Sequence, residues 1–196
     1  MKIQPSKNSE RTEIASLINK LNKEGEKLPR QAVSKIAAYG IAAIPQLLAS
    51  METSGNVRIK SWSATALGAI GSKKIIPDLR KSLNDPNMSV RLHAMFSLEK
   101  LRDPKLGEYL VPLLNDRSGG IRVNAIAIIG RIKYLKAGKN IIACTKDNKW
   151  YIRQAAARAL GYFKLSSAIK ELKKLEQDER KAVREAATKS LQFIQN

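Results

Sequence analysis

Residues 152–161 read Ile-Arg-Gln-Ala-Ala-Ala-Arg-Ala-Leu-Gly, and this pattern of apolar, basic and small residues returns every 31 positions along the chain. The first residue of the pattern, here called the anchor, is apolar in all six copies. The anchors are Leu28, Ile59, Val90, Ile121, Ile152 and Val183. Arginine directly follows four of them, and Lys60 follows a fifth. A fixed period of this length indicates a repeat protein, in which one unit of secondary structure cannot bury its apolar face alone.

The columns of the repeat have helical spacing. Small residues stand four positions after each anchor, and large apolar residues stand eight and eleven positions after it. These columns are Ala32, Ser63, Ala94, Ala125, Ala156 and Ala187; then Ile36, Leu67, Leu98, Ile129, Leu160 and Leu191; then Tyr39, Ile70, Leu101, Ile132, Phe163 and Ile194. Offsets of 0, 4, 8 and 11 lie on one stripe of an α-helix and on no face of a strand. We therefore predict one helix per repeat with a buried stripe that includes all six anchors.

A second apolar helix is predicted in each repeat, because Leu48, Leu79, Leu110, Ile141 and Leu172 each lie twenty positions after an anchor. Four aspartates precede their anchors by five residues, where a short polar side chain is expected to cap the first N–H groups of a helix. They are Asp85, Asp116, Asp147 and Asp178. Pro112 interrupts an apolar run and is expected to kink its helix. The chain is thus predicted to form twelve helices in six antiparallel pairs.

The predicted boundaries enclose nearly the whole chain. An apolar stripe at Ile14, Leu17, Ile18 and Leu21 places the start of the first helix near Glu10, and the last helix is expected to end at Ile194. Residues 1–9 are interpreted as a flexible tail, and residues 10–196 as a single domain, because a solenoid grows by adding repeats.

The strings Val90-Arg91-Leu-His-Ala94-Met-Phe-Ser-Leu98 and Ile152-Arg153-Gln-Ala-Ala156-Ala-Arg-Ala-Leu160-Gly161 resemble the second helix of HEAT repeats. They are most similar to the short HEAT-like repeats of phycobilisome lyase subunits. The resemblance implies an all-α, right-handed α-solenoid (an α-α superhelix) of six HEAT-like helix pairs over residues 10–196. It also implies that the aspartate and arginine columns form a ladder of hydrogen-bonded pairs between repeats. Such repeats occur in lyase subunits, adaptors, hydroxylases and nucleic-acid binders, so the fold does not define the activity.

Several features favour a cytoplasmic, intracellular protein. No stretch approaches the roughly 20 apolar residues of a membrane-spanning helix, and the sequence that begins Met-Lys-Ile-Gln-Pro lacks the apolar core of a secretory signal. The single cysteine, Cys144, cannot form an internal disulfide and lies among apolar residues, which indicates a buried filler. The sequence does not predict an oligomeric state.

The net charge of +19 is the first indication of a partner. It rises along the chain, from +3 over residues 1–56 to +6 over 57–130 and +10 over 131–196. A lysine-rich exterior can serve solubility alone. An excess of this size favours an acidic partner, which could be a nucleic acid, an acidic protein or an anionic membrane surface.

One face of the anchor helices combines basic and aromatic residues. Positions −1, +2, +3, +6 and +10 relative to each anchor lie opposite the buried stripe, and we call these thirty positions the groove face. In HEAT-like solenoids this face lines the concave surface. The basic and aromatic members are Lys27, Arg30, Arg58, Lys100, Arg131, Arg158, Lys189, Trp62, Phe96, Tyr151, Tyr162 and Phe193, and the one carboxylate is Glu185. Exposed aromatic rings together with arginine are typical of binding hot spots. The alternative is that the rings pack against neighbouring repeats, and for Trp150 and Phe193 this alternative and the binding role are equally favoured.

The sequence contains few motifs that would indicate an enzyme. His93 has no second histidine near it for a metal site, no His-Glu pair of the HEAT-repeat hydroxylase type is present, and no phosphate-binding glycine loop occurs. The aspartate that the HEAT-like DNA glycosylases need in an aromatic cleft is also missing, since the aspartates stand in the capping column. We therefore expect no catalytic residue, no cofactor and no metal, although a lyase-like role without a readable motif stays open.

The sequence thus predicts a non-catalytic scaffold or adaptor that holds an acidic protein or peptide in a basic, aromatic groove. The predicted binding residues are Arg58, Trp62, His93, Phe96, Lys100, Arg131, Tyr151, Arg158 and Tyr162. The alternative is a nucleic-acid-binding protein that contacts phosphates and stacks its rings on unpaired bases. A phycobilisome-lyase-like subunit is a lesser alternative.

Overall fold

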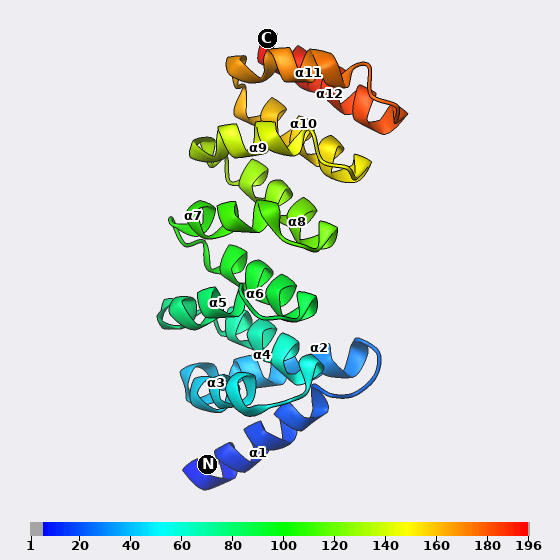
Figure 1. Ribbon diagram of the computed structural model, residues 1–196. Coiled ribbons are helices and arrows are strands. Elements are labelled where there is room, and N and C mark those ends of the chain that lie inside the picture. Colours follow the sequence, from blue (N-terminus) through cyan, green and yellow to red (C-terminus); the bar gives the residue numbers. More distant parts are fainter. Residues whose placement is uncertain (1–5, 196) are drawn as a thin grey trace. The chain divides into compact units, whose positions relative to one another are not determined.

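The computed structural model describes residues 6–195, and within this range every element is helical. The twelve predicted helices are all present as α1 to α12, and five short 3-10 segments, η1 to η5, join them. The chain divides into two compact units, Met1–Asp103 and Pro104–Asn196. Figure 1 shows the order of the helices along the chain.

Unit 1 holds three helix pairs. Its elements are α1 (Lys7–Lys20), α2 (Lys27–Ala38), η1 (Gly40–Ala43), α3 (Ile44–Thr53), α4 (Val57–Ile70), η2 (Lys73–Ile75), α5 (Ile76–Ser82) and α6 (Met88–Leu101). In each pair the first helix packs on the second, and the second helices α2, α4 and α6 pack on one another in sequence. The first helix begins at Lys7, three residues before the predicted start at Glu10. Most of the predicted flexible tail, residues 1–5, lies outside the described residues.

Unit 2 repeats this arrangement. Its elements are α7 (Leu106–Leu110), η3 (Val111–Asn115), α8 (Gly119–Arg131), η4 (Leu135–Ala137), α9 (Gly138–Cys144), α10 (Trp150–Phe163), η5 (Ser166–Ala168), α11 (Ile169–Leu175) and α12 (Lys181–Gln195). The second helices α8, α10 and α12 pack side by side. The kink predicted at Pro112 takes the form of a change of helix type, because α7 ends at Leu110 and the chain continues as a 3-10 helix.

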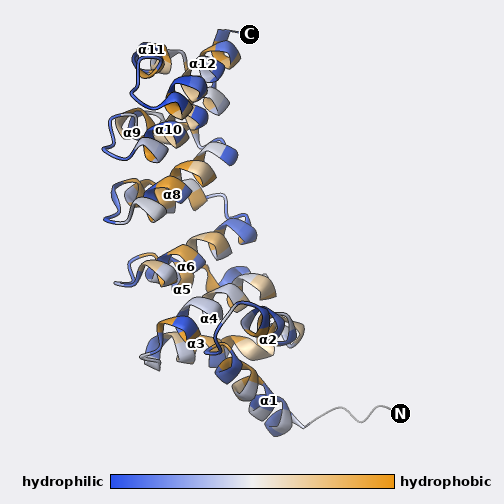
Figure 2. Ribbon diagram, turned by 90° about the vertical axis from the view of Figure 1, so that its right-hand side faces the viewer, coloured by the Kyte–Doolittle hydropathy of each residue, from blue (hydrophilic) through white to orange (hydrophobic). Residues whose placement is uncertain are grey.

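The core is formed by the predicted columns. Every residue of the small column and of the large column eight positions after the anchors is buried, and in Figure 2 most turns are hydrophilic while the helices carry the hydrophobic residues. Four anchors are buried as predicted, from Val90 to Val183. The prediction is wrong for Leu28, which is 50% exposed, and only partly right for Ile59, which is half-buried. Leu28 lies at the start of α2, directly after the α1–α2 turn, and no earlier helix pair covers it within the described residues.

The aspartate column has a different local role from the one predicted. Each aspartate accepts a hydrogen bond from the backbone N–H two residues later, as Asp147 does from Lys149 at 2.8 Å. The cap position falls at that later residue, for example Asn87 before α6 and Lys149 before α10. The aspartates therefore close the turn before the helix and do not cap its first N–H groups. Their pairing with arginine between repeats is present in unit 2, where Arg122 contacts Asp147 and Arg153 contacts Asp178.

Glycine brings the second helices of unit 2 close together. A Cβ atom added at Gly161 would lie 2.6 Å from the Ser190 hydroxyl on α12, and one added at Gly130 would lie 3.1 Å from the Ala159 side chain on α10. Since real Cβ contacts are rarely this short, larger residues at these positions would push the helices apart. The small residues at these positions thus permit the close packing of adjacent second helices.

No single helix within residues 6–195 is long and apolar enough to cross a membrane. One pair, Lys27–Ala38 with Gly40–Thr53, reaches the required length and composition only when both parts are taken together, and it is bent by 118°.

Candidate binding site on the second helices

The groove face is open, as the sequence predicts. Of its thirty positions only Ser61 and Ala186 are buried, and the others are half-buried or exposed. Three large rings on it are substantially exposed, with Phe96 at 42%, Tyr162 at 52% and Phe193 at 46%. Packing between repeats therefore does not account for these aromatic side chains. Each unit carries its own pockets on this face.

In unit 1, one pocket of about 840 Å³ lies across α2, α4 and α6. It brings together four of the predicted binding residues, Trp62, His93, Phe96 and Lys100. Residues with small or polar side chains complete the lining, among them Ser34, Ala37, Thr65 and Ala69.

His93 is held in place inside the unit 1 pocket. Its Nδ1 lies 2.7 Å from the Thr65 hydroxyl, and its ring meets Trp62 edge-on with centroids 5.3 Å apart. Burial lowers the pKa of His93, although the carboxylate of Glu26 acts in the opposite direction. The neutral imidazole is therefore favoured near neutral pH, and His93 contributes ring surface and hydrogen bonding more than charge. The sequence predicted His93 and Trp62 but not Thr65, although Thr65 stands six positions after an anchor and so on the groove face.

Two arginines of unit 1 are engaged in other contacts. Arg58, a predicted binding residue, donates hydrogen bonds from Nη2 to the carbonyl oxygens of Lys23 and, at 2.9 Å, Gly25 in the α1–α2 turn. These contacts fix that turn, and Arg58 does not line the unit 1 pocket, so its role in binding stays a prediction. Arg30 does line the pocket, but its guanidinium lies 2.5 Å from the Glu26 carboxylate. Lys100 is exposed on the same pocket, and within the described residues it has no ion-pair partner.

Unit 2 carries two neighbouring pockets that share one wall. The α8–α10 pocket has a volume of about 350 Å³ and includes Arg131 and Tyr151. The α10–α12 pocket has a volume of about 430 Å³ and includes Lys189 and Phe193. Three residues of α10 line both pockets, namely Gln154, Arg158 and Tyr162. Spaced four residues apart, they form a ridge along one side of the helix, and we call them the α10 ridge.

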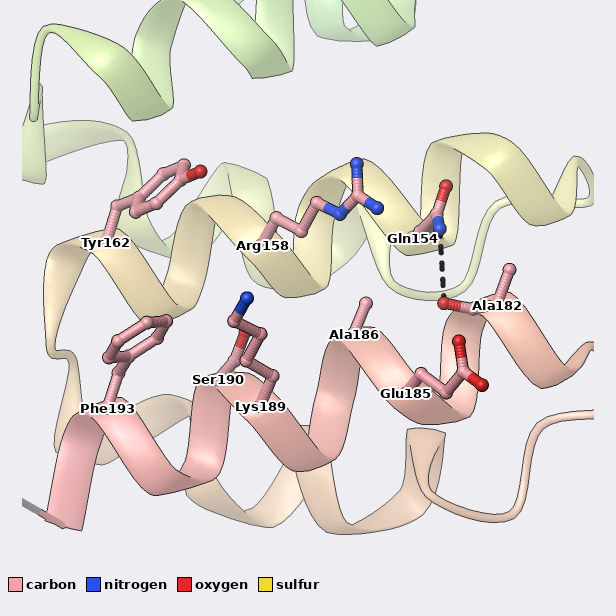
Figure 3. Close-up of a pocket in the computed structure, with 9 residues that line it drawn as sticks. All are labelled: Gln154, Arg158, Tyr162, Ala182, Glu185, Ala186, Lys189, Ser190 and Phe193. Atoms are coloured by element: carbon pink, nitrogen blue, oxygen red, sulfur yellow. Dashed lines mark hydrogen bonds between the residues drawn. The ribbon is translucent and has the colours of Figure 1, made fainter.

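Figure 3 shows how the side chains of the α10–α12 pocket lie. Tyr162 and Phe193 occupy the same end of the pocket, and Lys189 rises between the helices, with its Nζ 6.0 Å from the Phe193 ring centroid. Near the other end, Gln154 donates a hydrogen bond of 3.2 Å to the carbonyl of Ala182. The only carboxylate lining this pocket, Glu185, lies 3.6 Å from the ammonium group of Lys181. The charges available to a ligand are therefore mainly the positive ones.

Four predicted residues of unit 2 lie where the sequence placed them. Arg131, Arg158 and Tyr162 are exposed, and Tyr151 is half-buried. Within the described residues Arg158 makes no ion pair, so its guanidinium is available to a ligand. Trp150, next to Tyr151, is 39% exposed and meets that ring edge-on at 5.9 Å, but it does not line either pocket. The Trp150 side chain thus lies at the border of the site.

Within residues 6–195 no three histidine, cysteine, aspartate or glutamate side chains gather closely enough to hold a metal ion. Burial raises the pKa of the Cys144 thiol to about 11, so it is protonated at neutral pH and a poor nucleophile.

Comparison with known families identifies two parts of the chain. Residues 138–196 match the model of HEAT repeats, and residues 59–85 match the model of the PBS lyase HEAT-like repeat. No curated protein matches the sequence.

Solved structures with the same fold cover nearly all of the chain. The complex of CpcE and CpcF of phycocyanin lyase from Nostoc sp. PCC7120 is 23% identical, with a TM-score of 0.56, over 98% of this chain and 78% of that one. A designed armadillo repeat protein in complex with the peptide (KR)4 is 19% identical, with a TM-score of 0.59, over 93% and 99% of the two chains. A further engineered protein is 18% identical, with a TM-score of 0.59, over 93% and 96%.

The two matches agree with the helix pairs that recur every 31 residues: the chain contains HEAT repeats, over residues 138–196, and a PBS lyase HEAT-like repeat, over residues 59–85.

Proposed function

We propose that the groove face binds an acidic peptide segment of a partner protein without chemical turnover, and that the protein acts as a scaffold or adaptor in the cytoplasm. The observation that carries this proposal is the α10 ridge. Arg158 and Tyr162 lie between two pockets. Half of the other residues that line these pockets are alanine, glycine or serine, and the three basic residues of the lining outnumber its one carboxylate. Such a surface offers a carboxylate a partner and offers an apolar side chain a place to be buried.

The sign of the charge supports an acidic ligand. Residues 104–196 carry 19 basic and 8 acidic residues, a net charge of +11. A designed repeat protein of the same fold has been solved with the basic peptide (KR)4. The groove face of the present chain requires a ligand of the opposite charge, because Arg131, Arg158 and Lys189 would repel a basic peptide.

Protein binding is preferred over nucleic-acid binding because of how the rings are held. Trp62 is half-buried and in T-shaped contact with His93, so part of its ring surface is already covered by the protein. The pockets between the helices are also lined by alanine and valine side chains, which suit the burial of apolar side chains. The net charge of +19 favours nucleic acid as the second candidate.

A titration of the full chain distinguishes these candidates. Fluorescence anisotropy would compare an acidic peptide containing phenylalanine with single-stranded and duplex nucleic acid, at about 50 mM and about 200 mM salt. We expect micromolar or tighter binding of the peptide and moderate salt dependence. Tighter binding of either nucleic acid, falling by orders of magnitude at the higher salt, would overturn the proposal. A lyase-like role is suggested by the similarity to CpcE and CpcF of phycocyanin lyase. It predicts instead that an isolated chromophore binds and that acidic peptides do not compete with it.

A further inference from the structure

The two pockets of unit 2 and the ridge between them define an order of side chains in a ligand. We infer that this site recognises an acidic segment in which one or two carboxylates are flanked on both sides by large apolar side chains. The inference rests on the proposed function and specifies the ligand of the same site. It follows from the fact that Arg158 lines both pockets, so its guanidinium stands between them.

Each pocket provides an apolar wall for one side chain. The α8–α10 pocket is lined by Val123, Ala127, Ala155 and Ala159. The α10–α12 pocket is lined by Ala182 and Ala186 together with the half-exposed ring of Phe193. Tyr162 contributes to both. Volumes of about 350 and 430 Å³ leave room for one large side chain in each pocket.

Charge selects what lies between the two apolar side chains. Arg158 is exposed, and its neighbours on the ridge are the neutral Gln154 and Tyr162. Arg131 lines the far side of one pocket and Lys189 the far side of the other. The one carboxylate, Glu185, is paired with Lys181 at 3.6 Å, and its repulsion of an acidic ligand is reduced. A carboxylate above the ridge can therefore reach the Arg158 fork between the two pockets, with little opposing negative charge nearby.

The helix spacing sets the distance between the flanking side chains. Packed helices lie roughly 8–10 Å apart, and the close contacts at Gly130 and Gly161 hold α10 against α8 and against α12. An extended chain advances about 3.1–3.4 Å per residue. In an extended segment that crosses the helices, the two side chains that enter neighbouring pockets are thus about three residues apart. The sequence Phe-Glu-Glu-Phe has this arrangement, with both phenylalanines outside and both carboxylates in the middle.

An isomeric peptide pair tests the order directly. The first probe carries Phe-Glu-Glu-Phe and the second carries Glu-Phe-Phe-Glu, within identical Gly-Ser flanks, so composition and net charge are the same. Isothermal titration of the full chain is expected to give at least tenfold tighter binding of the first probe. Arg158→Gln should weaken the first probe by about tenfold or more and reduce the difference between the two probes.

Two matched variants each fill one of the two pockets with a phenylalanine ring. Ala155→Phe occupies the α8–α10 pocket and Ala182→Phe the α10–α12 pocket, and each residue lines only that one pocket. Both alanines are half-buried, so the added rings can extend toward solvent, and circular dichroism would verify that the variants fold. Each variant should remove most of the preference for Phe-Glu-Glu-Phe and change the affinity for Glu-Phe-Phe-Glu little.

The outcomes separate this inference from the proposed function. Equal affinity for the two isomers, with Arg158→Gln still weakening both, would overturn the ordered recognition and leave acidic-peptide binding intact. Absence of binding for both isomers, at concentrations at which nucleic acid binds, would overturn the proposed function itself. A preference for Phe-Glu-Glu-Phe that both filled variants retain would place the ligand elsewhere on the chain and overturn the inference.

Discussion

The Arg122 guanidinium donates two hydrogen bonds to the Asp147 carboxylate, 2.9 Å from Nε and 3.1 Å from Nη2, and a third of 2.9 Å from Nη1 to the backbone carbonyl of Asp116. Thirty-one residues later, Arg153 makes the same three contacts with Asp178 and the carbonyl of Asp147. One arginine therefore joins its own turn to the turn of the next repeat.

Arg122→Ala is expected to lower the stability of the fold by about 2 kcal/mol, because it leaves the Asp147 carboxylate and the Asp116 carbonyl without their partner. Both side chains of the pair are only 15% exposed, so water replaces the lost contacts poorly. Thermal unfolding followed by circular dichroism measures the change. Affinity for an acidic peptide should be unaltered in the folded variant. Loss of binding at unaltered stability would show that Arg122 contacts the partner.

The Arg153–Asp178 pair should make stability fall at acidic pH. The hydrogen bond from Arg153 lowers the pKa of Asp178 in the folded protein. A carboxyl with a depressed folded-state pKa stabilises the fold above its unfolded pKa of about 4, and this contribution is lost as the pH falls through the lower folded-state value. Melting temperatures measured from neutral pH down to about pH 3 should therefore decline below about pH 4. Asp178→Asn should be less stable at neutral pH and show a smaller decline, and an unchanged decline would contradict this assignment.

Lys60→Arg should add a missing contact to the ladder. Lys60 stands in the arginine column, and Asp85 lies 25 residues later, the same separation as in the two pairs of unit 2. The Asp85 carboxylate already accepts the Asn87 N–H at 2.7 Å, as its counterparts do, and both Lys60 and Asp85 line a pocket of about 540 Å³. The longer, forked arginine side chain is expected to bridge this space.

We expect a gain of about 0.5–1 kcal/mol from Lys60→Arg, measured by urea unfolding. The same substitution combined with Asp85→Asn is the control, since the gain should disappear if it depends on the pair. An equal gain in both backgrounds would mean that the arginine acts through another contact.

The period of the sequence was enough to predict the fold. Buried columns at offsets 4 and 8 identify the helices, because each repeat presents the same stripe to its neighbours. The exposure of Leu28 could not be read from its column, since it depends on which helices stand beside α2. The role of the aspartates was also misassigned, because the two-residue difference between a turn and a cap lies within the error of any helix boundary.

The candidate site was predicted as a face but not in its contacts. The 3.6-residue period places Trp62, Phe96, Arg158 and Tyr162 on one side of their helices, and this is where the structure has them. Whether a basic residue is available depends on partners from other elements. Arg58 could be assigned to the α1–α2 turn only once the carbonyls of Lys23 and Gly25 were placed in space. The shared wall between two pockets is likewise a property of neighbouring helices and not of one repeat.

Leu98→Ala should be strongly destabilising. Leu98 is fully buried in α6, and removing its side chain leaves a cavity that the neighbouring helices cannot fill completely. We expect a loss of about 2–5 kcal/mol in chemical unfolding. Leu28→Ala is the matched control, because the same substitution at a side chain that is 50% exposed should cost less than about 1 kcal/mol. Similar losses at both positions would contradict the assignment of Leu28 to the surface.

Substitutions on the groove face should separate contact from charge. Trp62→Ala and Phe96→Ala are each expected to weaken binding of the acidic partner by about 1–3 kcal/mol through lost contact, with little dependence on salt. Arg131→Ala and Arg158→Ala should weaken it in a salt-dependent way, because screening already reduces their contribution at high ionic strength. The double variant Lys73→Ala with Lys74→Ala is the control, since both lysines are exposed in η2 and line none of the pockets described above. Affinities measured by titration at low and high salt decide between the two kinds of effect. If the control lost as much affinity as the groove arginines, binding would reflect diffuse charge attraction, and the groove face would not be the binding site.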